Sequence, residues 1–139
     1  MNSSNFRVLL FSVLLASVLS GAPLRSSISA DHPGITHTLL FKGPVPGTDE
    51  QVIVWDTQYA PGAINPRHLH PAAVTFRVIS GTGIWQEEGK PPVTLHAGET
   101  LLAPAGTIHT HWNPSTTEPL RFIELIVAKK GQDRSVPRP

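Results

Sequence analysis

The strongest constraint on the fold is a regular alternation of short apolar runs with Gly- and Pro-containing breakers, which continues from residue 31 to residue 128. Each run has the length of a β-strand, and the breakers carry residues that favour tight turns. About eight strands at such spacing predict an all-β sandwich or antiparallel barrel. The apolar runs are residues 37–41, 51–59, 74–79, 84–86, 93–95, 101–103, 108–112 and 120–128.

Length and charge limit the classes of function. The chain has 139 residues, which is the size of one domain, and its formal net charge is +1. The basic residues are scattered, so the positive surface that a nucleic-acid binder needs is missing, and we expect no nucleic-acid partner. Cysteine is absent. Disulfides and thiolate metal ligands are therefore excluded.

The two ends of the chain differ from its middle. Residues 1–20 have the pattern of a secretory signal peptide, with Arg7 before an apolar stretch and small residues suited to cleavage between residues 20 and 30. About twelve apolar residues are too few to span a membrane, which takes about twenty. We expect a secreted or periplasmic protein with no membrane attachment after cleavage, a barrel over 31–128 and a flexible tail over 129–139.

Five residues near the end of the alternating region form a spaced motif. Gly98, Pro104, Gly106, His109 and Asn113 have the spacing G-x5-P-x-G-x2-H-x3-N. In this segment Pro and Gly make a tight turn that places the histidine on the returning strand. The motif resembles the second conserved motif of the cupin superfamily. The resemblance implies a small single-domain cupin whose fold is an antiparallel β-barrel, also called a double-stranded β-helix or jelly roll.

An upstream segment resembles the first cupin motif, G-x5-H-x-H followed by a glutamate and then a glycine. Its histidines are His68 and His70, and its closing glycine is Gly81. The glutamate is missing, because its place is taken by Val74, or by Thr75 in the neighbouring register. The two histidines are two residues apart on an extended segment, so both side chains point to one face, which in a small barrel is the interior.

The resemblance implies that His68, His70 and His109 bind a divalent metal, which is Fe(II), Mn, Ni, Zn or Cu. Leaving three buried imidazoles unpaired would cost roughly 1–3 kcal/mol each, and a metal removes that cost. The alternative is that they are strand-end histidines satisfied by water. Three neutral ligands leave the ion its full charge and about three open positions, which favours a small anionic molecule as ligand or substrate.

Three more residues are catalytic candidates, each with an ordinary alternative. His111 shares a face with His109, so it is a fourth ligand, a general base or a supporting side chain. Glu124 acts as a base or late ligand if it points inward, and is simply solvated if it points outward. Arg77 either clamps an anionic substrate or lies at the surface. Exposure near turns is expected of the other histidines, His32, His37 and His96.

These residues favour a metal-dependent enzyme, either a dioxygenase-like oxidoreductase or a lyase or isomerase, acting on a small anionic molecule. The cupins that the three-histidine pattern resembles include non-haem iron oxygenases. The alternative is a non-catalytic module that binds a small ligand or a metal. Metal-free sugar epimerases need a histidine base oriented by a buried carboxylate, and with only Asp56 and Glu124 inside strands that class ranks last. The small core also predicts a homodimer.

Overall fold

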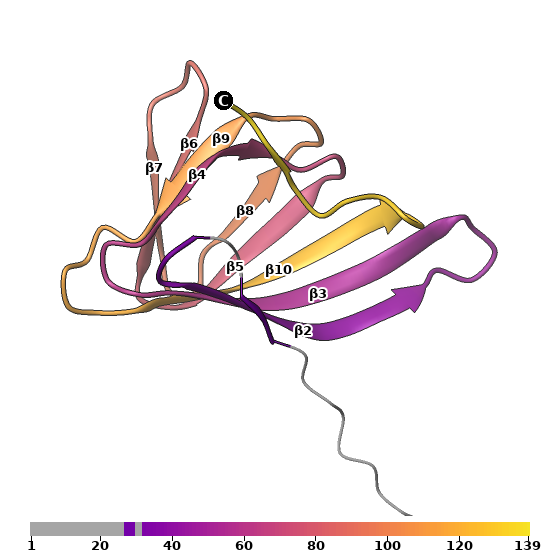
Figure 1. Cartoon of the computed structure of the whole chain (residues 1–139), viewed down its shortest axis with the longest axis horizontal. Helices are drawn as coiled ribbons and strands as arrows, with labels where there is room; N and C mark the ends of the chain where they lie inside the picture. Colours follow the sequence, from indigo (N-terminus) through magenta and orange to yellow (C-terminus); the bar gives the residue numbers. More distant parts are fainter. Residues whose placement is uncertain (1–26, 30–31) are drawn as a thin grey trace, which may run out of the picture.

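The structure is a computed structural model that describes residues 27–29 and 32–139 (Figure 1). The expected signal peptide, residues 1–20, lies outside the described residues. The described part of the chain consists of β-strands and connecting segments without any helix. Accordingly, this part contains no helix that is long and apolar enough to cross a membrane.

The strands form two antiparallel sheets that face one another (Figure 1). The first sheet has the order β1 (Ser27–Ser29), β2 (Ile35–Pro44), β3 (Glu50–Tyr59), β10 (Leu120–Lys129), β5 (Val74–Ser80) and β8 (Thr100–Ala103). The second has the order β11 (Val136–Pro137), β4 (Ile64–Leu69), β9 (His109–Trp112), β6 (Thr82–Glu87) and β7 (Val93–His96). The predicted all-β antiparallel barrel is confirmed.

Each of the predicted apolar runs coincides with a strand, whereas β4 and the short strands β1 and β11 were not predicted. The sequence predicts a turn up to Pro66 and an extended segment only around His68 and His70, because the first half of β4 is polar and contains that proline. The pairing of β4 with β9 shifts register between Asn65 and His68, so Pro66 and Arg67 form a bulge. Beyond the bulge His68 is paired with His109. The bulge therefore sets one motif histidine directly opposite the other.

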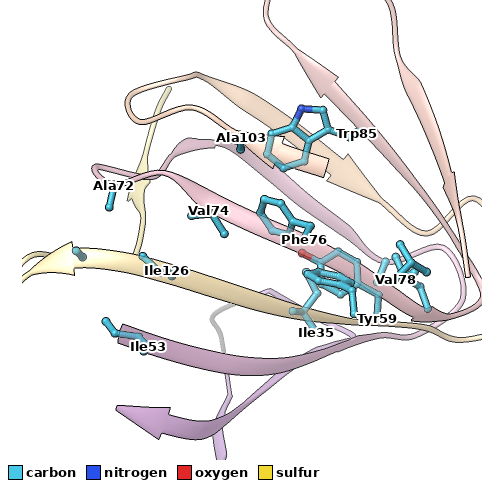
Figure 2. Packing of buried hydrophobic residues seen from close by; sticks show 14 residues of the cluster. Ile35, Ile53, Tyr59, Ala72, Val74, Phe76, Val78, Trp85, Ala103 and Ile126 are labelled. Carbon is cyan, nitrogen blue, oxygen red and sulfur yellow. The ribbon is translucent and has the colours of Figure 1, made fainter. Parts of the chain in front are cut away.

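The core lies between the sheets, and β10 shows how it is built. In β10 the buried residues alternate strictly with more exposed ones. The inward row is Leu120, Phe122, Glu124, Ile126 and Ala128. Large side chains from other strands pack against this row, including Phe76, whose ring lies 5.7 Å from that of Phe122 and 4.9 Å from that of Trp85 (Figure 2). Glu124 is thus held among core residues by strand geometry.

Two glycines are required by the turns that connect the motif strands. Gly81 has a φ of 78°, and a Cβ there would lie 2.4 Å from the carbonyl oxygen of Pro119, so no other residue fits between β5 and β6. Gly106 has a φ of 77°, and its N–H donates to the carbonyl oxygen of His70 at 2.8 Å. This bond ties the turn of the second motif to the first motif.

The C-terminal residues 129–139, expected to form a flexible tail, lie against the barrel. The chain leaves β10 in the first sheet and crosses to the second, where β11 pairs with β4 (Figure 1). Val136 is paired with Leu69 and Pro137 with His68. This partner strand is more than 60 residues away in sequence, so the local composition of the tail, polar and rich in Pro, contains no signal for it.

Candidate metal centre

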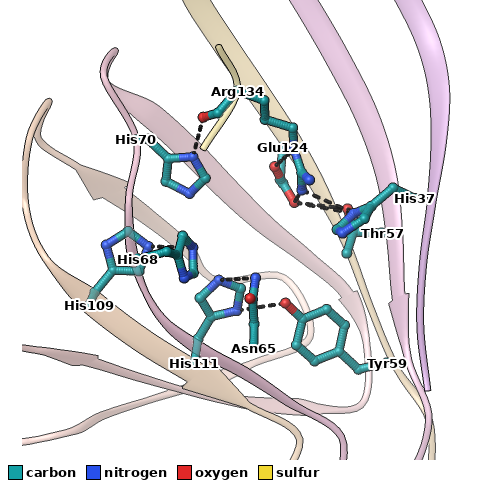
Figure 3. A network of polar contacts seen from close by, with 10 residues as sticks. All are labelled: His37, Thr57, Tyr59, Asn65, His68, His70, His109, His111, Glu124 and Arg134. Atoms are coloured by element: carbon teal, nitrogen blue, oxygen red, sulfur yellow. Dashed lines mark hydrogen bonds and ion pairs between the residues drawn. The ribbon is translucent and has the colours of Figure 1, made fainter. Parts of the chain in front are cut away.

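Four buried histidines converge inside the barrel (Figure 3). His68 and His70 lie in and just after β4, and His109 and His111 lie on β9. The ring centroids of His68 and His109 are 4.3 Å apart, and the ring of His70 lies 5.1 Å from each of them. Ring nitrogens of His68, His109 and His111 lie within 4.8 Å of one another. The structure therefore brings the histidines of both motifs together.

Hydrogen bonds to main-chain carbonyl groups determine the tautomer of three of these rings. In each case the ring nitrogen Nδ1 faces the carbonyl oxygen, which can only accept, so Nδ1 carries the proton and Nε2 carries a lone pair. Nδ1 of His68 donates to the carbonyl oxygen of Pro66 at 2.6 Å, and Nδ1 of His109 donates to that of Thr107 at 2.8 Å. Nδ1 of His70 donates to the carbonyl oxygen of Arg134 at 2.7 Å. These three are the histidines that the sequence predicts as ligands.

The Nε2 atoms of these rings lack ordinary partners. Those of His68 and His109 are 3.1 Å apart, although both are acceptors in these tautomers. The Nε2 atom of His70 is buried and has no hydrogen-bond partner in the described part of the chain. Unpaired acceptors facing one another in a buried site are unfavourable unless a cation lies between them. The donor set consequently fits a divalent metal ion.

His111 differs from these three in its bonding. Its Nδ1 lies 3.0 Å from the hydroxyl of Tyr59, and its Nε2 lies 3.4 Å from the side-chain amide of Asn65. Its ring also stacks on Trp85, at 5.3 Å between centroids. By the distances between ring nitrogens, the third member of the cluster with His68 and His109 is His111. By the hydrogen bond from Nδ1 to a main-chain carbonyl oxygen, the third member is His70. Because both nitrogens of His111 have partners, its bonding suits a supporting side chain.

Burial keeps these histidines neutral. It lowers the pKa of His68 to about 4, and together with the nearby His68 it lowers the pKa of His109 to about 3. The pKa values of His70 and His111 are also lowered, mainly by burial. The rings are therefore unprotonated near neutral pH, which is the form that binds metal.

We expect the metal-free protein to lose stability as the pH falls from 6.5 through 4. The unfolded chain binds protons on these histidines near the ordinary pKa of 6.5, whereas folded His68 and His109 bind them only near 4 and 3. The unfolded state thus binds more protons in this window, and acid favours it. Urea unfolding followed by tryptophan fluorescence at several pH values measures the effect. A free energy of unfolding that stays level from pH 6.5 to 4 contradicts it.

Glu124 points into the barrel. The sequence left both an inward and an outward orientation open, and the structure shows the inward one. Its side chain is 1% exposed. One carboxylate oxygen accepts from the hydroxyl of Thr57 at 2.8 Å and from Nη2 of Arg134 at 2.5 Å, and the other accepts from Nε of Arg134 at 3.0 Å. Burial alone would raise the pKa of Glu124, but the charge and hydrogen bonds of Arg134 hold it at about 2. Glu124 is an ionised, paired carboxylate.

The expected surface exposure of His37 is wrong. His37 is 4% exposed, and its Nδ1 lies 2.9 Å from the hydroxyl of Thr57 and accepts from Nη2 of Arg134 at 3.0 Å. Burial is the main cause that lowers the pKa of His37 to about 4, and the positive charge of Arg134 adds to the effect. The alternation of residues along β2 indicates this burial: His37 lies between two threonines and shares its strand face with the apolar Ile35.

Arg77 does not reach the histidines. It lies on the outer face of β5, exposed to solvent, and its Nη1 donates to the hydroxyl of Thr100 at 3.1 Å. Its neighbours Phe76 and Val78 point inward, so alternation turns Arg77 away from the interior. Its position gives no support to the predicted role as a clamp for an anionic substrate. Arg134, which the sequence predicts to lie in the flexible tail, is the arginine that contacts the buried Glu124.

A cavity of about 290 Å³ lies beside the histidines, between β4 and the C-terminal residues. Its wall includes His68, His37 and Arg134, together with the side chain of Asn65. One motif histidine is therefore accessible from a chamber of small-molecule size.

An antiparallel barrel whose adjacent strands β4 and β9 carry paired histidine motifs defines the cupin class of proteins. The chain belongs to the cupin family: the family described as Cupin domain matches residues 55–126. The resemblance inferred from the two motifs is thus confirmed.

Relatives and solved structures agree with this membership. An auxin-binding protein of Nicotiana tabacum is 29% identical over 136 residues, which cover 86% of this chain and 72% of the relative. An oxalate oxidase of Triticum aestivum is 27% identical over 106 residues, and the match covers 66% of this chain but only 43% of the relative. A cupin-like protein from Thermotoga maritima has a TM-score of 0.66 at 26% identity, covering 82% of this chain and 85% of its own.

Proposed function

We propose that this cupin is a mononuclear metal-dependent enzyme with His68, His70 and His109 as the metal ligands. The observation that carries the proposal is the common tautomer of the three rings, each with Nδ1 bonded to a carbonyl oxygen and Nε2 left for a metal. A protein that only buried these rings would gain nothing from aligning three lone pairs. The ion is one of Fe(II), Mn, Ni, Zn and Cu, all of which accept imidazole ligands.

The proposed substrate is a small anionic molecule, and the reaction is of the dioxygenase type or a lyase or isomerase reaction. No carboxylate is among the three ligands, so a bound divalent ion keeps its charge and attracts an anion. The ion would supply Lewis-acid polarisation of a substrate oxygen and, with a redox-active metal, oxygen chemistry. The chain itself supplies the chamber of about 290 Å³ that receives the substrate next to His68. Tyr59 and Asn65 hold the supporting ring of His111 in place.

The names of the two plant relatives support different versions of this proposal. The wheat relative is named for the oxidation of oxalate, a small anion, which favours an enzyme. The tobacco relative is named for binding auxin, and this chain covers 72% of its length, which favours a non-catalytic binding module as the second candidate. Both versions place a small molecule at the same histidines.

Metal content and oxygen uptake test the proposal. Elemental analysis of the purified protein should find about one metal ion per chain, as expected for a mononuclear three-histidine site. The Fe(II)-loaded protein is then supplied with oxalate, diketones, flavonols and phenolic acids while oxygen uptake is recorded. Negligible metal that no added ion restores overturns the metal-dependent function. Metal binding without turnover, combined with thermal stabilisation by one of these compounds, supports the binding module.

We also propose that the protein is exported to the periplasm or the extracellular space. The support is the sequence pattern of residues 1–20, a basic residue followed by an apolar stretch and small residues. Cell fractionation, with N-terminal sequencing of the purified protein, tests it. Export predicts a new N-terminus between residues 20 and 30, and a cytoplasmic protein that retains residue 1 contradicts it.

We expect the protein to be a homodimer that pairs through the outer face of the first sheet. A cross-strand row on this face joins Phe41, Val54, Leu125, Thr75 and Leu102, of which Leu102 is 64% exposed and Phe41 is 54% exposed. Exposed apolar side chains that gather on one face, here Phe41, Leu125 and Leu102, commonly mark an interface.

Sedimentation equilibrium measures the oligomeric state. Leu102→Glu combined with Leu125→Lys should convert the dimer to a monomer, because burying two charged side chains in an apolar interface is costly. Val93→Lys is the matched control, since Val93 is 46% exposed but lies on the second sheet. A wild-type protein that is monomeric at all concentrations contradicts the expectation.

A further inference from the structure

The C-terminal strap, residues 131–139, connects the two sheets across the side of the barrel that holds the histidines. At its start, Gly131 adopts a φ of 80° and turns the chain back after β10. Further along, the strap pairs with β4 through β11, and the N–H of Arg138 donates to the carbonyl oxygen of Arg67 at 3.0 Å. The strap is therefore bonded to the strand that carries His68.

One residue of the strap, Arg134, contacts both the metal centre and the opposite sheet (Figure 3). Its carbonyl oxygen accepts from Nδ1 of His70 at 2.7 Å. Its guanidinium pairs with Glu124 on β10 and lies 5.4 Å above the ring of Trp55 on β3. The carbonyl group of Arg134 is therefore bonded to a motif histidine while its side chain is bonded to the opposite sheet.

His70 depends on this contact in a way that the other two ligands do not. His68 and His109 bond to carbonyl oxygens only two residues earlier in the chain. The carbonyl group that orients His70 is 64 residues away in sequence. Loss of the strap would leave His68 and His109 in their tautomers and free the ring of His70 to take either one.

We propose that Arg134 is a positioning residue for the metal centre: its ion pair with the buried Glu124 holds the strap so that the carbonyl group of Arg134 keeps the Nε2 atom of His70 available to the metal. This inference rests on the proposed metal-binding function and extends it to a residue outside both cupin motifs. Carbonyl partners of metal-binding histidines raise affinity by fixing the ring, and their loss typically weakens binding roughly 10- to 100-fold.

The test uses a double variant, Glu124→Met with Arg134→Ser. Changing Arg134 alone would leave a buried charge unpaired and endanger folding, whereas methionine at 124 fills a similar volume without needing a partner. Arg121→Ser is the matched control. Arg121 forms the same kind of bidentate ion pair, with Asp56, at distances of 2.8–3.2 Å, but on the outer face of β10.

Two measurements are made on each protein. Competition with a chromophoric chelator gives the Zn²⁺ dissociation constant, and nitrogen NMR of the metal-free protein reports which nitrogen of each histidine carries the proton. We expect the double variant to bind Zn²⁺ roughly 10- to 100-fold more weakly and to show mixed tautomers at His70 alone. The control should match the wild type in both.

Unchanged affinity together with an unchanged His70 tautomer in a folded double variant overturns the inference. Tautomer changes at all three histidines also overturn it, since they indicate general loosening. A wild type that does not bind Zn²⁺ overturns the proposed function and the metal-supporting role of Arg134 together. In that case the NMR data still decide whether the strap orients His70, so the two failures can be told apart.

Discussion

His109→Ala is expected to abolish metal binding while the barrel remains folded. His109 supplies an Nε2 atom 3.1 Å from that of His68, and its ring stacks on Trp85 at 3.8 Å between centroids. Removing one of three ligands leaves two, which is too few for a stable mononuclear site. Elemental analysis after incubation with excess metal and desalting measures the loss.

His96→Ala is the control for this prediction. His96 ends β7 at the exposed edge of the second sheet and is not part of the buried cluster. Its replacement should leave the metal content at the wild-type level, and circular dichroism should show the same strand content for both variants. Wild-type metal content in His109→Ala would show that the ligands lie elsewhere.

Arg134→Ala is expected to reduce the free energy of unfolding by about 3–5 kcal/mol, the usual cost of breaking a buried ion pair on one side. Glu124 would keep a buried charge, because its side chain is only 1% exposed and the hydroxyl of Thr57 would be its remaining hydrogen-bond donor in the described part of the chain. Urea denaturation at neutral pH measures the change.

Two further variants serve as controls for this prediction: one at the outer ion pair of Arg121 with Asp56, and one that removes Glu124 together with Arg134. Arg121→Ala removes the partner of Asp56 from a pair whose arginine side chain is 45% exposed, and a solvent-exposed arginine of this kind contributes little to stability, so we expect a much smaller loss than for Arg134→Ala. Adding Glu124→Met to Arg134→Ala should restore most of the lost stability, since no buried charge then remains. Equal losses for the two arginines would mean that Glu124 is not held as a buried ion.

The strands and the turns were predictable because they depend on near neighbours in the sequence. Period-two alternation and Gly/Pro breakers predicted nearly all of the long strands. β4 was missed because its pairing depends on β9 and on a bulge at Pro66, neither of which shows in its own residues. The alternation of residues in β2 predicts that His37 points inward. In β10 it does not decide the direction of Glu124, because both faces of that strand are apolar.

What the sequence alone predicted is the barrel and the convergence of His68, His70 and His109; the tautomers of His68 and His109 follow from local contacts that the structure shows. Those features depend on strand period and on carbonyl groups two residues away. The partner of His70, the pairing of Glu124 with Arg134 and the path of the C-terminal strap were decided by the tertiary structure. They join residues from opposite sheets, and a polar segment such as 131–139 acquires partners only when the barrel presents a strand edge and a buried carboxylate to it.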